Sequence, residues 1–282
     1  MAKGKWAAFP HRDKAFDYAG DKLAKAWPKL HAGDQEPYPD AVRVAALIKA
    51  NPKLGKAADA EKIASRLQDA WRAYHRGDFQ EATEAGEELG TLGTVVACKA
   101  AGIHGVYLLD KEADKLKRFD EIAKRAAAAA AQLPGEANCH YFHAFALGRY
   151  SQKLSIAKAL KMGLAGKVRQ SLDAALELEP KHAEAHTALA LYHAEIIGKI
   201  GALIGGMTYG AKAADAEKHI KTALKLTPDS PIAHVEHGNL QLLLHGERGE
   251  DAAAAAYERA AKLKPRDAME ALDARFAREQ IE

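Results

Sequence analysis

Apolar residues recur along most of the chain at intervals of three and four positions, which is the spacing of one face of an α-helix. Alternating runs of β-branched residues, which would predict strands, are absent from the sequence. Proline and glycine interrupt the pattern and divide it into segments of ordinary helix length. The pattern therefore predicts an all-α protein. The expected helices are 12–31, 39–50, 57–76, 78–90, 92–109, 112–132, 136–162, 166–178, 182–207, 211–226, 230–245, 250–263 and 267–281.

In the later part of the chain, the residues before each helix end follow a common spacing, which we call the repeat frame. Pro180, Pro228 and Pro265 each follow a predicted helix. Before each proline stand an alanine five positions away, a larger apolar residue eight away, and a small or apolar residue twelve away. A recurring frame indicates stacked helix pairs, because each pair leaves an apolar face that the next pair covers. We therefore expect about six hairpins and a C-terminal capping helix with one buried stripe.

These residues resemble the tetratricopeptide repeat family, whose unit is a helix–turn–helix of about 34 residues. The family's turn between paired helices is similar to Gly77-Asp78-Phe79, and its large-then-small pair on the first helix is similar to Leu147-Gly148 and Leu189-Ala190. The resemblance extends over residues 60–265 and is looser before them. It implies a right-handed α–α superhelix whose concave groove binds a protein or peptide partner. The motif specifies a fold and says little about the ligand.

The proline spacing departs from the family's repeat length. Pro180 and Pro228 are 48 residues apart (228 − 180), whereas the family has about 34. We attribute the excess to two lengthened first helices, near 140–165 and 182–210, with ends rich in glycine and alanine. Such ends favour close packing of two long helices, and a self-association or docking surface and a flexible lid are the alternatives. The expected domains are a degenerate hairpin at 1–55, the solenoid at 56–266 and the cap at 267–282.

The resemblance also implies which residues line the groove, namely fixed positions on the first helix of each pair. Here these positions mix aromatic, apolar and single polar side chains, which suits an apolar helix or an extended peptide. Asn239 matches the asparagine with which some relatives hold a peptide carboxylate, but Val235 and Thr187 stand where those relatives carry lysine. The alternative is that the aromatics fill the groove by packing. The implied groove residues are Leu67, Trp71, Tyr74, Phe145, Arg149, Gln152, Thr187, Leu191, Val235, Asn239 and Leu242.

Composition and charge narrow the function without naming it. With 48% hydrophobic and 28% charged residues among 282, the chain has the balance of an ordinary folded protein, and a net charge of +3 does not argue for nucleic acid. The N-terminus lacks a signal-peptide pattern. The longest apolar stretch, 189–207, is interrupted by His193, Glu195 and Lys199. We therefore expect a cytoplasmic protein without a membrane span.

Candidate catalytic chemistry is sparse. Cys98 and Cys139 are too few for a disulfide framework and lie in apolar contexts typical of core cysteines. The sequence has no nucleophile elbow and no paired-histidine zinc motif. The glycine-rich run 201–206 lacks the preceding strand and the following lysine of a phosphate loop. We expect a protein that is not an enzyme and that has no cofactor and no metal.

Histidine is the residue type that most suggests a special site, with 13 in the chain. His182 and His186 lie one helical turn apart, as in a helical metal site. In the repeat frame, however, His186, His234 and His237 occupy packing positions, and no cysteine or paired carboxylate accompanies them. Packing is the preferred interpretation. Buried imidazoles would also make the stack sensitive to mildly acidic pH.

Three functions from different classes fit these observations. The leading hypothesis is a non-enzymatic scaffold or adaptor that binds a protein partner in the groove. The first alternative is a structural homo-oligomer assembled through the extensions 157–166 and 198–210. The second is a binder of a small molecule or lipid, with an enclosed apolar cavity lined by Leu160, Leu203 and Ile204.

Overall fold

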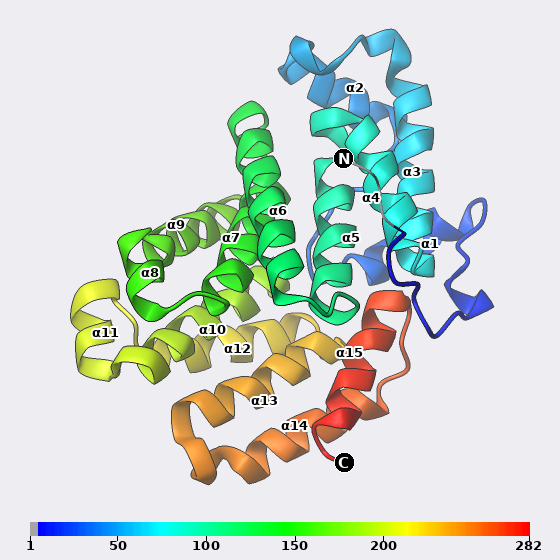
Figure 1. Cartoon of the computed structure of the whole chain (residues 1–282). Coiled ribbons are helices and arrows are strands. Elements are labelled where there is room, and N and C mark those ends of the chain that lie inside the picture. Colours follow the sequence, from blue (N-terminus) through cyan, green and yellow to red (C-terminus); the bar gives the residue numbers. More distant parts are fainter. Residues whose placement is uncertain (1–4) are drawn as a thin grey trace. The chain divides into compact units, whose positions relative to one another are not determined.

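Every regular element in the computed structural model, which describes residues 5–282, is a helix. The all-α prediction is therefore confirmed. The α-helices are α1 (Lys22–Leu30), α2 (Ala41–Ala50), α3 (Ala60–Arg76), α4 (Phe79–Glu88), α5 (Thr94–Tyr107), α6 (Glu112–Gln132), α7 (Ala137–Gln152), α8 (Ile156–Lys161), α9 (Leu164–Leu178), α10 (Ala183–Ile200), α11 (Ala202–Tyr209), α12 (Ala213–Leu226), α13 (Pro231–His245), α14 (Glu250–Lys262) and α15 (Ala268–Glu279) (Figure 1). The short 3₁₀ helices are η1 (Lys14–Phe16), η2 (Pro52–Leu54), η3 (Ala57–Asp59), η4 (Gly90–Gly93) and η5 (Gly246–Gly249).

The chain forms two compact units. The first unit contains the residues up to Lys29, then Glu36–Lys153 and Asp267–Met269. The second contains Leu30–Gln35, Leu154–Arg266 and Glu270–Glu282. The sequence pattern marks no boundary between positions 153 and 154, and the expected domains 1–55, 56–266 and 267–282 stay a prediction.

In the first unit, each helix from α2 to α7 packs on the next one along the chain (Figure 1). Helix α3 also touches α5, and α5 touches α7, so alternate helices are neighbours as well. The turn between α3 and α4 depends on Gly77, whose φ of 88° is readily adopted only by glycine. The Gly77 and Asp78 amides donate to the Tyr74 and Ala73 carbonyls at 2.9 Å each, and these bonds cap α3. The turn predicted at Gly77 is therefore formed.

An aromatic cluster holds the N-terminal part of this unit together. The Trp27 ring meets the Trp71 ring edge-on at 5.5 Å, and the imidazole of His75 stacks on Trp71 at 5.9 Å. Tyr74 meets Trp71 edge-on at 5.4 Å. Edge-on pairs align the positive ring edge with the negative ring face, which adds about 1 kcal/mol to the area that each ring buries. The aromatic residues of α3 are thus part of the core.

The second unit repeats the same local packing. Helix α9 packs on α10, α10 on α12, α12 on α13 and α13 on α14, and α10 also touches α13 (Figure 1). One apolar cluster joins α10, α12 and α13 around Ile220 and Leu240. A second cluster joins α13, α14 and α15 around Val235 and Tyr257. The alanines that flank these larger residues allow the helices to lie close together.

Three helix predictions are wrong. The segment 12–31 is helical only in η1 and α1, because Asp13 caps the short η1 and Gly20, with a φ of 56°, precedes α1. The extended helices near 140–165 and 182–210 are each broken in two. Ser155 accepts a hydrogen bond from the Lys158 amide and starts α8 as a new helix. Gly201, with a φ of 81° and a ψ of 155°, separates α10 from α11.

Candidate functional site

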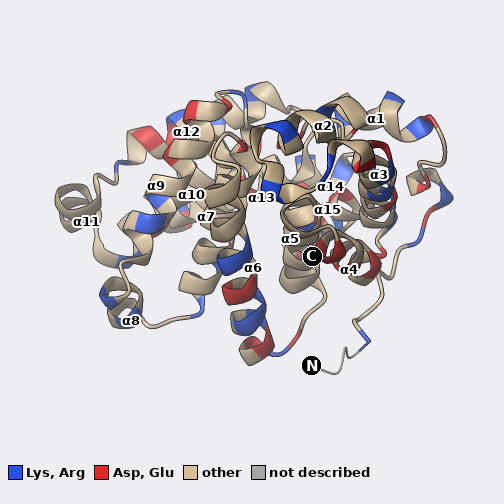
Figure 2. Cartoon of the chain, turned by 90° about the horizontal axis from the view of Figure 1, so that it is seen from above, with Lys and Arg blue, Asp and Glu red and all other residues tan. Residues whose placement is uncertain are grey.

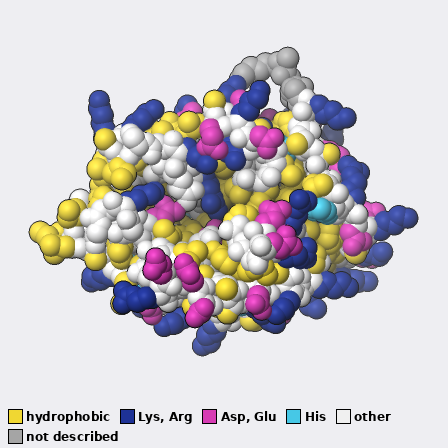
Figure 3. Space-filling view, turned by 60° about the horizontal axis from the view of Figure 1, so that its bottom comes forward, with side chains coloured by type: hydrophobic (Ala, Val, Ile, Leu, Met, Phe, Trp, Pro, Cys, Tyr) yellow, Lys and Arg dark blue, Asp and Glu magenta, His cyan; other side chains and the backbone are white. Residues whose placement is uncertain are grey.

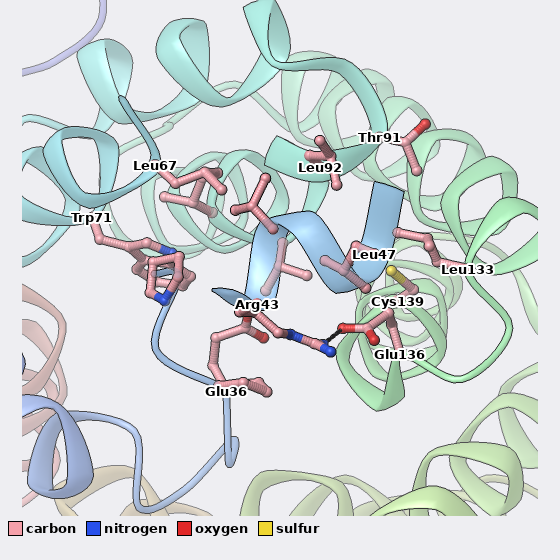
Figure 4. A pocket seen from close by; sticks show the side chains of 15 residues that line it. Glu36, Arg43, Leu47, Leu67, Trp71, Thr91, Leu92, Leu133, Glu136 and Cys139 are labelled. Atoms are coloured by element: carbon pink, nitrogen blue, oxygen red, sulfur yellow. Dashed lines mark hydrogen bonds and ion pairs between the residues drawn. The ribbon is translucent and has the colours of Figure 1, made fainter. Parts of the chain in front are cut away.

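The first unit contains a cleft between the segment that precedes α2 and the helices α2, α3, α5 and α7 (Figure 4). It holds about 480 Å³ of space, counting its open mouth. Most of that space is open to solvent, and the enclosed part is about 30 Å³, so the cleft is shallow. The lining residues are Glu36, Pro37, Pro39, Arg43, Val44, Leu47, Leu67, Trp71, Thr91, Leu92, Val95, Val96, Leu133, Glu136 and Cys139.

The wall of the cleft is apolar because several helices direct one face into it. On α2, Val44 and Leu47 are three positions apart, and on α3, Leu67 and Trp71 are four apart, so each pair shares a helix face. Leu67 and Trp71 are buried, whereas Leu47 is only half-buried and stands nearer to solvent. An apolar group that entered the cleft would therefore meet Leu47 before the buried Leu67 and Trp71.

Polar groups surround the mouth. The Arg43 guanidinium forms an ion pair with the Glu136 carboxylate, drawn as a dashed line in Figure 4. The Asn138 amide donates to the Glu36 carboxylate at 2.7 Å, and the Trp27 indole N–H donates to the Glu36 carbonyl at 2.6 Å. These bonds fix the segment that carries Pro37 at the edge of the cleft. An apolar wall with a charged, ordered rim is the usual design of a site that binds and orients a ligand.

The thiols near this site are not reactive. Burial raises the pKa of Cys139 well above its ordinary value, and burial raises the pKa of Cys98 to about 12. Both cysteines are reduced and buried. Since the thiolate is the nucleophilic form, neither sulfur is activated. Within residues 5–282, no group of three or more His, Cys, Asp or Glu side chains has an arrangement that could hold a metal ion.

The structure separates the predicted groove residues of the first unit into two sets. Leu67 and Trp71 line the cleft, and Tyr74 is buried beside them, with its hydroxyl donating to the Met269 sulfur at 3.0 Å. The other set is on α7. There the Arg149 guanidinium lies 5.7 Å from the Phe145 ring centre and 3.5 Å from the Gln152 side-chain oxygen.

In the second unit, most predicted groove residues are engaged within the protein. Thr187 and Val235 are buried, and Leu191 is half-buried. The Asn239 amide donates to the Glu236 carboxylate at 2.6 Å, and its oxygen accepts from the Tyr257 hydroxyl at 2.7 Å. Because the buried Glu236 carboxylate lies beside Asn239, a peptide carboxylate would be repelled there. Leu242 alone of this set is exposed.

Three histidines share a structural role that was not predicted from the sequence. His140, His186 and His234 each stand six positions after a proline, and each Nε2 donates to the carbonyl of that proline. The distances from Nε2 to the carbonyl oxygen are 3.0, 3.1 and 2.8 Å, and the histidine must be the donor because a carbonyl oxygen only accepts. The constant offset from proline was the available signal. These histidines fasten the chain that enters α7, α10 and α13.

Three imidazoles gather between α10 and α12 in the second unit. His186 Nδ1 lies 2.8 Å from His219 Nδ1, and the ring of His193 stacks on His219 at 6.3 Å. His193 Nδ1 accepts a hydrogen bond from the Lys212 amide. Since His186 donates through Nε2, its neutral form accepts from His219 at Nδ1. Two charged rings would bring two N–H groups together, so the cluster favours neutral imidazoles.

Acid is therefore expected to destabilise the protein. Burial, followed by the nearby His186 and His193, lowers the pKa of His219 from 6.5 to about 4, and burial with Arg118 lowers the pKa of His104 to about 4. Between pH 4 and pH 6.5, roughly, the unfolded chain binds more protons than the folded chain. The free energy of unfolding therefore falls as pH falls below about 6.5. We expect the free energy of unfolding to drop by about 2 kcal/mol from pH 7.5 to pH 5, after allowance for the partial exposure of His219.

Denaturant titrations at the two pH values measure this loss. The variant His219→Gln should show a smaller loss, and His11→Gln, at an exposed position, should behave like the wild type. Equal stability of the wild type at both pH values would contradict the prediction.

The enclosed apolar cavity predicted under the helix extensions is not formed by the three side chains named for it. Leu160, Leu203 and Ile204 are exposed on the surface of the second unit. They belong to the short helices α8 and α11, which the breaks at Ser155 and Gly201 turn away from a continuous helix path. The prediction that these three side chains line an enclosed cavity is wrong.

Comparison of the sequence with models of protein families and with curated proteins finds no match. Among the described helices, none combines the length and the apolarity needed to cross a bilayer.

Proposed function

We propose that the chain is a tetratricopeptide-like interaction module, a right-handed superhelix of helical hairpins that binds a protein partner and catalyses no reaction. The packing of each helix on the next, together with the contacts α3–α5, α5–α7 and α10–α13, supports such a stack. A close approach between paired helices supports it as well. A Cβ atom on Gly238 would lie 2.6 Å from the Tyr257 ring, so α13 and α14 meet where the family carries a small residue.

The cleft of the first unit is the proposed binding site. The observation that carries this proposal is that Leu67 and Trp71, two positions implied to contact a partner, line an apolar cleft with a charged rim. An apolar side chain of a peptide would enter beside Leu47 and Leu92. The Arg43–Glu136 ion pair and the Glu36 carboxylate would orient the peptide backbone and its polar groups. Trp71 and Tyr74 are buried, so they shape the cleft but expose little surface to a partner.

A peptide-display selection on the full-length protein tests this proposal. We expect the selected peptides to share an apolar or aromatic anchor residue and to bind Leu47→Glu at least about tenfold more weakly than the wild type, because one poorly solvated carboxylate costs more than about 1.4 kcal/mol in an apolar site. Val42→Glu is the matched control: Val42 is on the same helix, and its side chain is 79% exposed, away from the cleft.

Two results would count against the cleft. Peptides that bind Leu47→Glu and the wild type equally would place recognition elsewhere. A selection that returns peptides without any common apolar residue would contradict the anchor. Circular dichroism of both variants shows whether the substitutions leave the fold intact, since Leu47 is half-buried and Val42 is exposed.

A further inference from the structure

Helix α11 presents an apolar face to solvent. Leu203, Ile204 and Met207 are exposed to 76%, 58% and 82%, and they share one side of the helix. The opposite side packs on α10 through the buried Gly205, where a Cβ atom would lie 2.9 Å from the Ile196 side chain. Glycine at this point brings α11 against α10 and turns its large side chains outward. Large aliphatic residues this exposed on one short helix indicate an interaction surface.

Helix α8 presents the same kind of face at the same end of the second unit (Figures 1 and 2). Ile156 and Leu160 are one turn apart and about half exposed. Lys158 and Lys161 stand between and beside them, exposed, and within the described chain no carboxylate forms an ion pair with either lysine. The short helix therefore exposes an aliphatic pair on one side and two lysines on its other sides.

Basic residues outnumber acidic ones around both helices, although Arg169 pairs with Asp173 and Lys199 pairs with Glu195 at the borders of the two segments. From Leu154 to Leu172 the chain carries the basic residues Lys158, Lys161, Lys167 and Arg169 and no acidic residue. From Ile196 to Ala214 it carries Lys199 and Lys212 and no acidic residue. Helix α11 itself is uncharged, whereas helices such as α6 carry both signs (Figure 2). In the space-filling view, hydrophobic side chains form a projection at the left edge, where α11 lies in Figure 1 (Figure 3).

We propose that α8 and α11, with their flanking lysines, form a surface that docks on an anionic lipid bilayer. The exposed aliphatic side chains would enter the boundary between head groups and acyl chains, and the lysines would meet the lipid phosphates. A second copy of the chain is disfavoured as the occupant, because it would bring lysines against lysines. The surface projects from the unit, and a projecting apolar surface fits a deformable lipid interface better than the groove of a protein. This proposal does not depend on the cleft of the first unit.

Vesicle flotation with the full chain tests the proposal. We expect the protein to float with phosphatidylcholine vesicles that contain phosphatidylserine and to remain behind with phosphatidylcholine alone. The variant Leu203→Ser/Met207→Ser should reduce the bound fraction at least about tenfold, since it removes the two most exposed apolar side chains of the surface. Val42→Ser is the control, because its side chain is 79% exposed on α2 in the other unit.

Charge reversal tests the electrostatic contribution to vesicle binding separately from the apolar contribution. Lys158→Glu/Lys161→Glu should weaken binding to anionic vesicles by more than about tenfold, because each lysine near such a surface contributes about fivefold in affinity. Lys49→Glu/Lys53→Glu, exposed in the first unit, should leave binding unchanged. Added salt should weaken binding of the wild type.

Three outcomes would overturn the proposal. The first is wild-type protein that binds neither kind of vesicle. The second is equal binding by the wild type and Leu203→Ser/Met207→Ser. The third is a wild-type dimer in light scattering that this variant converts to a monomer, without vesicle binding, which would assign the surface to a second copy instead. All four substituted side chains are exposed, so loss of folding does not explain a loss of binding.

Discussion

Gly93→Ala is expected to lower the free energy of unfolding by about 3 kcal/mol or more. A Cβ atom on Gly93 would lie 2.1 Å from the Gly86 carbonyl oxygen, and one on Gly86 would lie 2.7 Å from the Gly93 oxygen. The two glycines thus let α4 and the start of α5 meet backbone to backbone. A side chain can rotate away from an added methyl group, but a helix backbone can only move as a whole. The substitution must therefore separate α4 from α5.

The conformation of Gly93 makes this test specific. Its φ of −95° is open to alanine, so the loss would come from the contact and not from backbone strain. Gly148→Ala is the matched control within the same unit: it is also a glycine on a packed helix, but nothing lies within 4 Å of the added Cβ. Because alanine favours a helix interior, this control is expected to gain about 0.5–1 kcal/mol. Denaturant unfolding of both variants measures the difference, and equal stabilities would show that the glycine contact has no energetic role.

Helix positions could be predicted from the sequence where apolar periodicity and end signals agree. The segment 112–132 is found unchanged as α6, and 230–245 differs from α13 by one residue, because Ser230 and Pro231 mark its start. The prediction of one helix over 12–31 is wrong because the segment contains a single α-helix, α1. The apolar residues before α1 lie in chain that mostly lacks helical hydrogen bonds. Apolar periodicity predicts which residues are buried better than it predicts which backbone groups are hydrogen-bonded to one another.

The candidate site was harder to predict than the fold. Resemblance to a repeat family indicated Leu67 and Trp71, which do line the cleft. The other side of the cleft comes from Arg43 and Glu136, 93 positions apart, and no local pattern links them. The breaks in the two extended helices were also not predicted. Ser155 and Gly201 can both occur within a continuous helix, and only the backbone geometry at each residue shows that the helix ends there. Pair contacts across long sequence distances are a property of packing and leave no periodic trace.

Asp267→Ala is expected to destabilise the protein by about 3 kcal/mol or more, because it takes a carboxylate away from a buried imidazole. Asp267 Oδ2 lies 2.8 Å from His75 Nδ1, and both side chains are almost fully buried within the first unit. The pair joins residues 267–269 to α3, near the place where Tyr74 donates to the Met269 sulfur. In the variant the buried His75 N–H loses its carboxylate acceptor, and burial keeps water from replacing it.

Two further variants separate the charge from the shape of this side chain. Asp267→Asn keeps an acceptor for the His75 N–H and should lose less stability than Asp267→Ala, since only the charge is removed. Asp229→Ala is the surface control: Asp229 pairs with Arg259 at 3.3 Å, both side chains are more than half exposed, and exposed pairs contribute less than about 1 kcal/mol. Thermal and denaturant unfolding rank the three variants. If Asp267→Ala were as stable as Asp229→Ala, the pair with His75 would not hold the 267–269 segment, and contacts such as that between the Tyr74 hydroxyl and the Met269 sulfur would have to do so.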